Sequence, residues 1–592
     1  MPNKDLEIIK ENMVERAMEL WEIEDRTLMD PVVELLLDVF AHEFSKINQD
    51  LKISDSKLVE RIAKILVKES WYMPLPAHAL IRMEPVDDYL WIDKETHFYY
   101  QKVLEGNESL DIFFTSLTSF QIIKARAICT IKNKGIAFFD ERGRTFRTIP
   151  PKPDGQIWGH TLWVGIEIDR KLLEKTDQLS ISIMPRDSDL APYLRMTKVF
   201  NAEDDLVPIR PQYSNKNTGN THYYNSVFRY YQDYLYTLDI TKCNALQTLP
   251  SKCKEAFHQE DLEDMDQELL WLKFQFPAVF DQEELRKLQI SLNTFPVVNR
   301  KLKYKQHNVK RNGRIVSISS PNEHFLNVAK MEDDKGREFH PTLNSEISNL
   351  EGSYSLYFGE LEQFDERNAK QLLEQVIQKV REEGSAFSAI GYDILNAHLE
   401  DLNKKLDVLE RKLSLGQNNH STGGKQYIMS FPYKDTSNLE CHYWITDAHE
   451  ANGLPQGTKL AQYKLGGIVP NTIRLWTDTI GGRYKNSTKE QVANLRYGLI
   501  SKDRIVSRED IKEFVKTIIG KSVINVEVSS GVSVSPNKKE GLVRTTEVHI
   551  NMRTNTPLSP ENQKRLAHYI QSELEHKSVH NIPYKVTICL QQ

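Results

Sequence analysis

The sequence predicts a multidomain α+β protein with a helical N-terminal region, a β-rich middle, a helical hairpin or coiled segment, and a C-terminal ferredoxin-like α+β module. Three observations predict this class. The chain of 592 residues is about three to four times as long as a typical domain. Its hydrophobic spacing changes from helical to strand-like and back. Its 40% hydrophobic and 27% charged residues are sufficient for several buried cores.

Changes in pattern and composition divide the chain into five predicted regions. They are a helical N-terminal region (1–76), a β-rich middle (77–345), a helical segment (346–415), a β-rich segment after a flexible linker (416–505), and the ferredoxin-like module (506–592). The linker lies within 414–426, where Ser, Gly, Gln, Asn and Thr dominate.

The N-terminal region predicts two amphipathic helices. Asp30 before Pro31 is a typical helix start, because the Asp side chain can accept from a free backbone N–H and proline at the first position loses no hydrogen bond. A second helix is expected after Ser54 or Ser56, with Pro74 ending it. The apolar faces of these helices are larger than the two helices can cover by themselves. We therefore expect this unit to bury part of its surface against a partner.

Short apolar runs separated by Gly, Pro, Asn and Asp predict a layered or sandwich-like β region in the middle. The expected strands are 127–131, 162–168, 179–184, 271–276 and 287–292. Four tyrosines follow a polar stretch in this region. They favour a half-buried strand or helix face over a base-stacking surface, because no basic residues surround them. These are Tyr230, Tyr231, Tyr234 and Tyr236.

The helical segment contains six leucines at alternating steps of four and three residues. This spacing is the a/d seam of a coiled coil, and charged residues lie between the leucines as a solvated flank requires. Such a narrow seam needs another helix, either the preceding one over 368–381 or one from a partner chain. We hypothesise a partner interface formed by Leu395, Leu399, Leu402, Leu406, Leu409 and Leu413.

The C-terminal region predicts an α-β-β-α-β order. Ser507 can cap a helix, with Asp510 three residues later as in a capping box. Strands are expected over 523–528 and 543–552, then a helix over 559–576 and a strand over 584–590. With one more strand before the first helix, this order is the split βαβ arrangement of ferredoxin-like folds.

Composition and motifs exclude several classes of function. The net charge of −6 argues against nucleic-acid binding. The sequence contains no run of about 18 apolar residues, so it predicts no membrane-spanning segment. Its five cysteines are scattered, which predicts a protein of the reducing cytoplasm. The sequence contains no complete phosphate-binding loop and no set of four metal ligands. Two smaller groups are better explained by a structural or surface role than by metal binding: His576 with His580, and Cys441 with His442 and His449. We therefore expect no cofactor, no metal and no enzymatic activity.

Three stretches, in this order, resemble the TssF family of type VI secretion baseplate subunits and the related J-like wedge proteins of contractile phage baseplates. The first is the Asp30 to Ala41 helix with the Met73-Pro74-Leu75-Pro76 element after it. The second is Phe295-Pro296-Val297-Val298-Asn299. The third is 488–590, in which Arg504-Ile505-Val506-Ser507-Arg508-Glu509-Asp510 leads into the predicted ferredoxin-like order. This stretch is similar to the phage-like C-terminal module.

The resemblance implies a structural wedge subunit without catalytic residues. It implies that two copies of the chain assemble with a TssG-like subunit, and that TssE-like and TssK-like subunits and the spike are further partners. It also implies a cytoplasmic location, in a baseplate docked at the cytoplasmic face of the inner membrane. Two alternatives stay open from the residues alone: a multidomain carbohydrate-active hydrolase, or a soluble binding adaptor.

Overall fold

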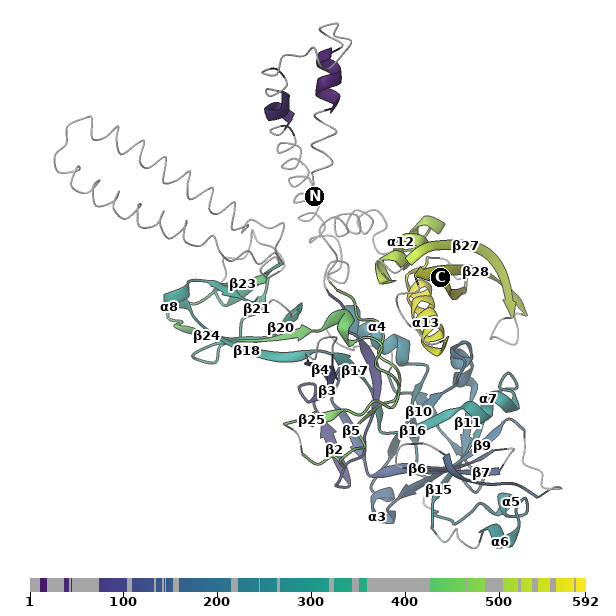
Figure 1. The fold of residues 1–592 in the computed structure, drawn as a ribbon. Coiled ribbons are helices and arrows are strands. Elements are labelled where there is room, and N and C mark those ends of the chain that lie inside the picture. Colours follow the sequence, from purple (N-terminus) through teal and green to yellow (C-terminus); the bar gives the residue numbers. More distant parts are fainter. Residues whose placement is uncertain are drawn as a thin grey trace.

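The computed structural model describes residues 74–358, 426–484 and 504–591 with short gaps, and residues 11–18, 33, 37–41 and 44 of the N-terminal region. The described part is a strand-rich mixed α/β protein (Figure 1). It contains several hydrophobic cores. All six leucines of the hypothesised seam lie outside the described residues.

A six-stranded central sheet organises the middle of the molecule. Its strand order is β25 (Ala461–Tyr463), β3 (His97–Val103), β4 (Ser109–Ser116), β17 (Thr294–Asn299), β1 (His78–Arg82) and β26 (Arg474–Leu475). A separate pair, β2 (Tyr89–Ile92) with β5 (Phe120–Ile123), packs nearby. Strands β25 and β26, which lie within the predicted segment 416–505, are thus part of this central sheet.

Two further sheets of the middle region enclose one hydrophobic core, as the predicted sandwich requires. The seven-stranded sheet has the order β12 (Leu206–Val207), β11 (Lys198–Phe200), β15 (Leu270–Gln275), β9 (Thr161–Ile168), β6 (Ala125–Lys132), β7 (Gly135–Phe139) and β8 (Thr145–Ile149). The four-stranded sheet has the order β13 (Ile209–Pro211), β14 (Leu235–Asp239), β10 (Gln178–Met184) and β16 (Gln289–Leu292).

Short helices connect these strands. They are α3 (Arg170–Leu173), η3 (Ser188–Met196), α4 (His222–Tyr231), α5 (Ser251–Lys254), α6 (Gln259–Leu262) and α7 (Gln282–Lys287). The polar residues Gln282–Lys287 form a helix because Asp281 caps it, its side chain accepting from Glu284 N, so the strand predicted to begin at Lys287 begins at Gln289.

The outer lobe, residues 301–358 and 426–446, contains two small sheets around its own core. One has the order β18 (Lys301–Asn308), β24 (Asn438–Thr446) and β20 (His324–Asp333), and α8 (Val309–Asn312) follows β18. The other has the order β19 (Ile315–Ser317), β23 (Gln426–Phe431), β22 (Ser353–Phe358) and β21 (His340–Pro341). Residues 353–358, predicted to belong to the helical segment, form a strand because β23 pairs with them up to Phe358 and Gln426.

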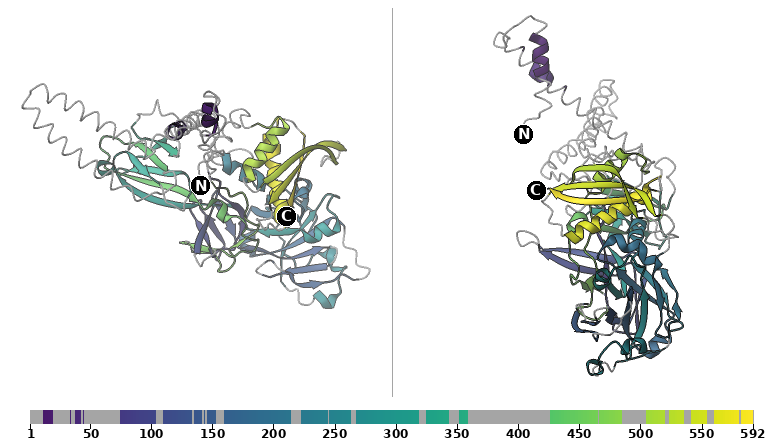
Figure 2. Two further views of the ribbon diagram at one scale, coloured as in Figure 1. Left: turned by 45° about the horizontal axis from the view of Figure 1, so that its top comes forward. Right: turned by 90° about the vertical axis from the view of Figure 1, so that its right-hand side faces the viewer.

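The C-terminal module consists of α12 (Arg508–Ile519), β27 (Val523–Val534), β28 (Leu542–Arg553), α13 (Pro560–Lys577) and β29 (Tyr584–Gln591). The predicted α-β-β-α-β order is confirmed. So is the capping box, since Ser507 Oγ accepts from Asp510 N at 3.2 Å and Asp510 Oδ2 accepts from Ser507 N at 2.8 Å. Figure 2 shows the module from two further sides, lying against the middle region.

The prediction that this module has a ferredoxin-like arrangement of strands is wrong. A split βαβ unit places a strand between the two strands that flank the second helix. Here β28 and β29 pair directly and in parallel, from Thr546 with Tyr584 to Arg553 with Gln591. The described residues directly before α12, 504–506, lie outside this sheet, and Ile505 bridges to Ser578 at the end of α13. Within its described residues the module is therefore a three-stranded sheet with two helices.

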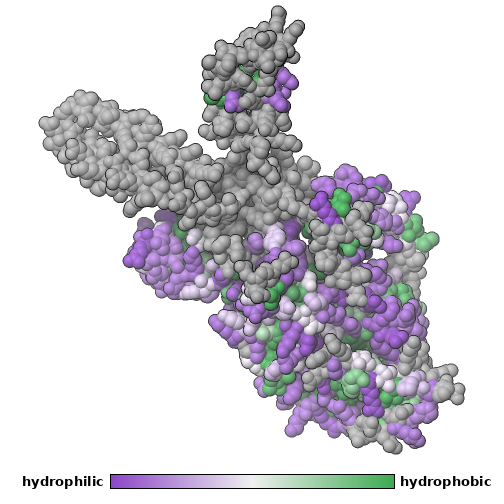
Figure 3. Space-filling model, in the orientation of Figure 1, coloured by the Kyte–Doolittle hydropathy of each residue, from purple (hydrophilic) through white to green (hydrophobic). Residues whose placement is uncertain are grey.

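The described part of the N-terminal region contains a helix over 11–18, with Val14 and Ala17 buried. Phe40 and Phe44 are 53% and 52% exposed. On the face drawn in Figure 3, hydrophilic residues cover most of the described surface and hydrophobic ones form small patches. None of the helices that the structure describes is long and apolar enough to cross a membrane.

Candidate interaction site

Aromatic side chains join the C-terminal module to the central sheet and α4. This aromatic junction consists of His78 from β1, Tyr230, Tyr231 and Tyr234 from α4 and the residues after it, and His568 and Tyr569 from α13. The imidazole of His78 lies 5.7, 5.5 and 5.3 Å from the rings of Tyr230, Tyr231 and Tyr569. Three of the four tyrosines that the sequence assigned to a half-buried face therefore form a buried packing surface, where three elements distant in sequence meet. The fourth, Tyr236, lies on β14 in the core between the two sheets of the sandwich.

The side chains of the aromatic junction are buried. Burial lowers the pKa of His78 from 6.5 to about 3, so its imidazole is neutral at physiological pH. Burial also raises the pKa of Tyr231 well above its usual value of 10. His78 Nδ1 and the hydroxyl of Tyr231 form a hydrogen bond of 3.0 Å. The residues thus act through packing and hydrogen bonds between neutral groups.

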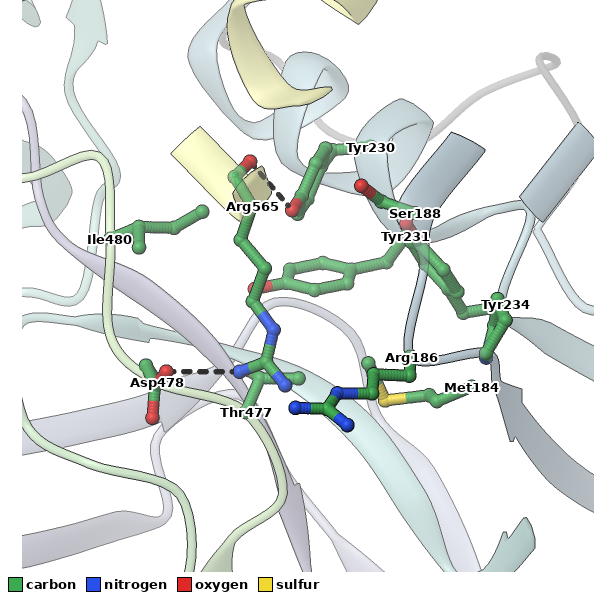
Figure 4. Close-up of a pocket in the computed structure, with 11 residues that line it drawn as sticks. Met184, Arg186, Ser188, Tyr230, Tyr231, Tyr234, Thr477, Asp478, Ile480 and Arg565 are labelled. Atoms are coloured by element: carbon green, nitrogen blue, oxygen red, sulfur yellow. Dashed lines mark hydrogen bonds and ion pairs between the residues drawn. The ribbon is translucent and has the colours of Figure 1, made fainter. Parts of the chain in front are cut away.

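Charged groups close the aromatic junction at one side, around a cavity of about 20 Å³ (Figure 4). The guanidinium of Arg565 on α13 lies 3.1 Å from Asp478, which also accepts from Gln456 N at 2.5 Å. The backbone carbonyl of Arg565 accepts from the hydroxyl of Tyr230 at 3.3 Å. Arg565 therefore connects α13 to both α4 and the 454–484 loop region.

The backbone at Gly481 approaches the aromatic junction closely. A Cβ at this position would come within 2.7 Å of His78 Nε2, and the φ angle of +87° also favours glycine. The buried guanidinium of Arg483, two residues on, donates to the carbonyl of Thr517 at the end of α12. Burial lowers the pKa of Arg483 to about 10. The 481–483 segment therefore contacts both His78 of β1 and the end of α12.

A second junction attaches the outer lobe to the central sheet through Asn299, the last residue of β17. Its Nδ2 donates to the Phe113 carbonyl and to Asp447 Oδ2, both at 2.9 Å. Its Oδ1 accepts from Thr446 Oγ1 at 2.7 Å and from Asp447 N at 2.9 Å. The fully buried amide thus satisfies its hydrogen-bonding groups with β4 and with the end of β24.

Arg300 reinforces this Asn299 junction. Its Nε donates to Thr115 Oγ1 at 2.6 Å, and its guanidinium lies 4.1 Å from the ring centroid of Trp444. The sequence indicated the Phe295 to Asn299 stretch only as a resemblance, and the positioning role of Asn299 was missed. A polar residue at the end of a wholly apolar strand was the available signal, because a buried amide must find hydrogen-bond partners.

One group among the described residues has the composition of a metal site. Glu332 of β20 and Glu440 and His442 of β24 bring their ligand atoms within 4.8 Å of one another. Lys330 Nζ lies 2.7 Å from Glu332 Oε2, and Tyr304 donates to Glu440 at 3.0 Å. Protein groups therefore already contact both carboxylates. Sequence reasoning missed this group because Glu332 lies on a different strand, directly opposite Glu440.

The structure does not bring Cys441, His442 and His449 together as one site. Strand alternation places Cys441 in the core of the outer lobe, where burial raises its pKa to about 12, and His442 on the other face. His449 stacks on Tyr484, with ring centroids 5.4 Å apart.

Comparisons with known proteins give one kind of match. No protein-family model and no curated protein matches this sequence. Among solved structures, the chain is similar to a chain of the type VI secretion system TssK-TssF-TssG baseplate subcomplex, determined by cryo-electron microscopy. The two chains are 10% identical in sequence, the comparison covers 94% of this chain and 96% of that chain, and the TM-score is 0.47.

Proposed function

We propose that this chain is a structural, TssF-like baseplate wedge subunit of a type VI secretion system or a related contractile injection machine. In this proposal two copies assemble with a TssG-like subunit around the spike, in the cytoplasm at the inner membrane, and the chain catalyses no reaction. The observation that carries the proposal is the ordered series of three sequence motifs, at 30–41 with 73–76, at 295–299, and at 488–590.

The position of the second motif supports a scaffolding role. All six residues of β17 are buried, and Asn299 at its end holds the outer lobe to the central sheet. A motif of this kind serves architecture, since its residues contact other parts of the same chain. The aromatic junction is equally architectural, because its titratable rings are buried and neutral.

The proposed partner contact is the leucine seam of 395–413. Replacing both Leu402 and Leu406 with Asp puts two charges on the apolar seam, which is expected to abolish co-purification with a co-expressed TssG-like subunit. The matched control, Lys404→Asp with Lys405→Asp, adds the same two side chains to the polar flank and should keep the complex. Size-exclusion chromatography with mass measurement reads both results.

If the complex survives in the seam variant, the leucines pack within the chain and do not form a partner contact.

A second test removes residues 1–76, whose described part leaves Phe40 and Phe44 about half exposed. We expect the truncated chain to stay soluble and to lose wedge assembly. Normal assembly by the truncated chain argues against a partner contact through the N-terminal region.

A further inference from the structure

A cleft of about 530 Å³ lies beside the aromatic junction, between the C-terminal module and η3 of the middle region. Side chains of α13, η3, α4 and all three strands of the module line it. Because η3 and α13 are in contact at its base, both parts of the molecule are needed to form it. Its position and size distinguish it from the small cavity inside the aromatic junction.

Two buried polar atoms of this cleft have no hydrogen-bond partner. They are Nδ1 of His568 on α13 and Oγ1 of Thr545 on β28, whose residues are 9% and 3% exposed. A buried polar atom without a partner costs about 1 to 3 kcal/mol, so folded proteins keep few of them. Two of them in one cleft indicate that a ligand with polar groups completes the site.

The backbone of β28 is also open at this cleft. Strand β29 pairs with β28 only from Thr546 onward, whereas Leu542 to Thr545 pair only with β27 among the described strands. The outer edge of these four residues offers N–H and C=O groups in line with the start of β29 at Tyr584. An extended peptide placed there would continue the line of β29 and add a short strand to the sheet.

The charge of the lining selects the chemistry of such a peptide. Three carboxylates, those of Asp189, Asp233 and Glu575, line the cleft against one ammonium group, that of Lys585. Arg195 pairs with Asp233 from a position that is 54% exposed, and the side chain of Lys585 is exposed as well. Both cations can move into solvent. Glu575 is itself exposed, and its Oε1 accepts from Tyr584 N at 3.4 Å.

We propose that this cleft binds an extended, basic segment of a partner chain, which pairs with the open edge of β28 and presents Lys or Arg side chains to Asp189, Asp233 and Glu575. The peptide backbone or its polar side chains hydrogen-bond to Thr545 and His568. The inference deepens the proposed function by giving a partner contact on the C-terminal module, and it rests on that function only for the identity of the partner.

The test uses the full chain and labelled decapeptides, so it needs no baseplate partner. One peptide alternates Thr and Lys, and its matched counterpart alternates Thr and Glu. Fluorescence anisotropy should show the basic peptide binding at least fivefold more tightly. Hydrogen exchange should show that the basic peptide protects the amides of 542–545. Equal affinity for both peptides, or protection only elsewhere, overturns the proposal.

Variants separate the site from general charge attraction. Thr545→Val removes a hydroxyl without a partner, so the free protein should melt at an equal or higher temperature while peptide affinity falls about fivefold. Thr130→Val removes another buried, unpartnered hydroxyl on β6 and should leave affinity unchanged. Asp189→Asn should weaken binding about threefold. Unchanged affinity in both cleft variants contradicts the proposal. Failure of the unaltered chain to co-purify with a TssG-like subunit, with peptide binding intact, contradicts only the proposed function.

Discussion

The C-terminal module and the outer lobe are attached to the same central sheet by different chemistry. The module is held by buried rings in edge-to-face and tilted contacts at the aromatic junction, around the neutral His78 of β1. The outer lobe is held by directional hydrogen bonds to Asn299 of β17, with Arg300 stacked on Trp444. Strands β1 and β17 are neighbours in that sheet, so one rigid element supports both attachments.

This difference determines what each attachment tolerates. Aromatic packing depends on volume and on exclusion of water, so it responds to side-chain truncation and to protonation of the buried imidazole. An amide with four partners depends on geometry and on the identity of each donor and acceptor, so it responds to the loss of the amide itself. The two junctions can therefore be broken separately.

The largest expected effect comes from Tyr231→Ala. This ring is 1% exposed and lies at the centre of the aromatic junction. Its truncation should cost about 3 to 5 kcal/mol of unfolding free energy and release the module as a protease-sensitive unit. Denaturant unfolding and limited proteolysis measure both effects. The control, Tyr89→Ala, changes a ring that is 59% exposed and should cost no more than about 0.5 kcal/mol.

Asn299→Ala is expected to have the next largest effect. It leaves the Phe113 carbonyl and the Asp447 carboxylate without the donor they share, so it should cost about 2 to 3 kcal/mol. Unfolding followed by hydrogen exchange should show faster exchange in β24, with the C-terminal module unaffected. The exposed Asn438→Ala serves as a control. Equal loosening of both parts would show that the junctions are not independent.

Acidification should destabilise the aromatic junction by a smaller amount and so distinguish it from the Asn299 junction. The unfolded chain protonates His78 near pH 6.5, whereas the folded chain resists protonation until its pKa of about 3. Between these values the unfolded state holds more protons, so stability falls as pH falls, by about 2 kcal/mol from pH 6.5 to pH 5. His78→Phe should flatten this dependence for the module in pH-resolved melting curves. An unchanged slope would assign the effect to other groups.

Much of the local structure follows from sequence patterns, and the sheet partners do not. Helical spacing and the Ser507 capping box predict α12, since both signals lie within a few neighbouring residues. Such local signals do not predict that β29 pairs with β28. Both the split and the direct βαβ arrangement have the same order of elements, and only the path of residues 504–506 along α13 decides between them.

The candidate sites show the same limit. Tyr230 and Tyr231 are recognisable as a packing face, but their partners His78 and Tyr569 are distant in sequence. The cleft beside them depends on unpartnered atoms of Thr545 and His568, which no composition or spacing reveals. The leucine seam remains a prediction from the sequence.

The pairing of Phe358 with Gln426 has a practical consequence for that seam. The chain leaves β22 at Phe358 and returns on the adjacent antiparallel strand β23 at Gln426, so these two described residues lie side by side. Two to five residues are enough to close a hairpin of this kind. The stretch that contains the leucines can therefore be excised, or exchanged for another segment, as a cassette on the described β scaffold.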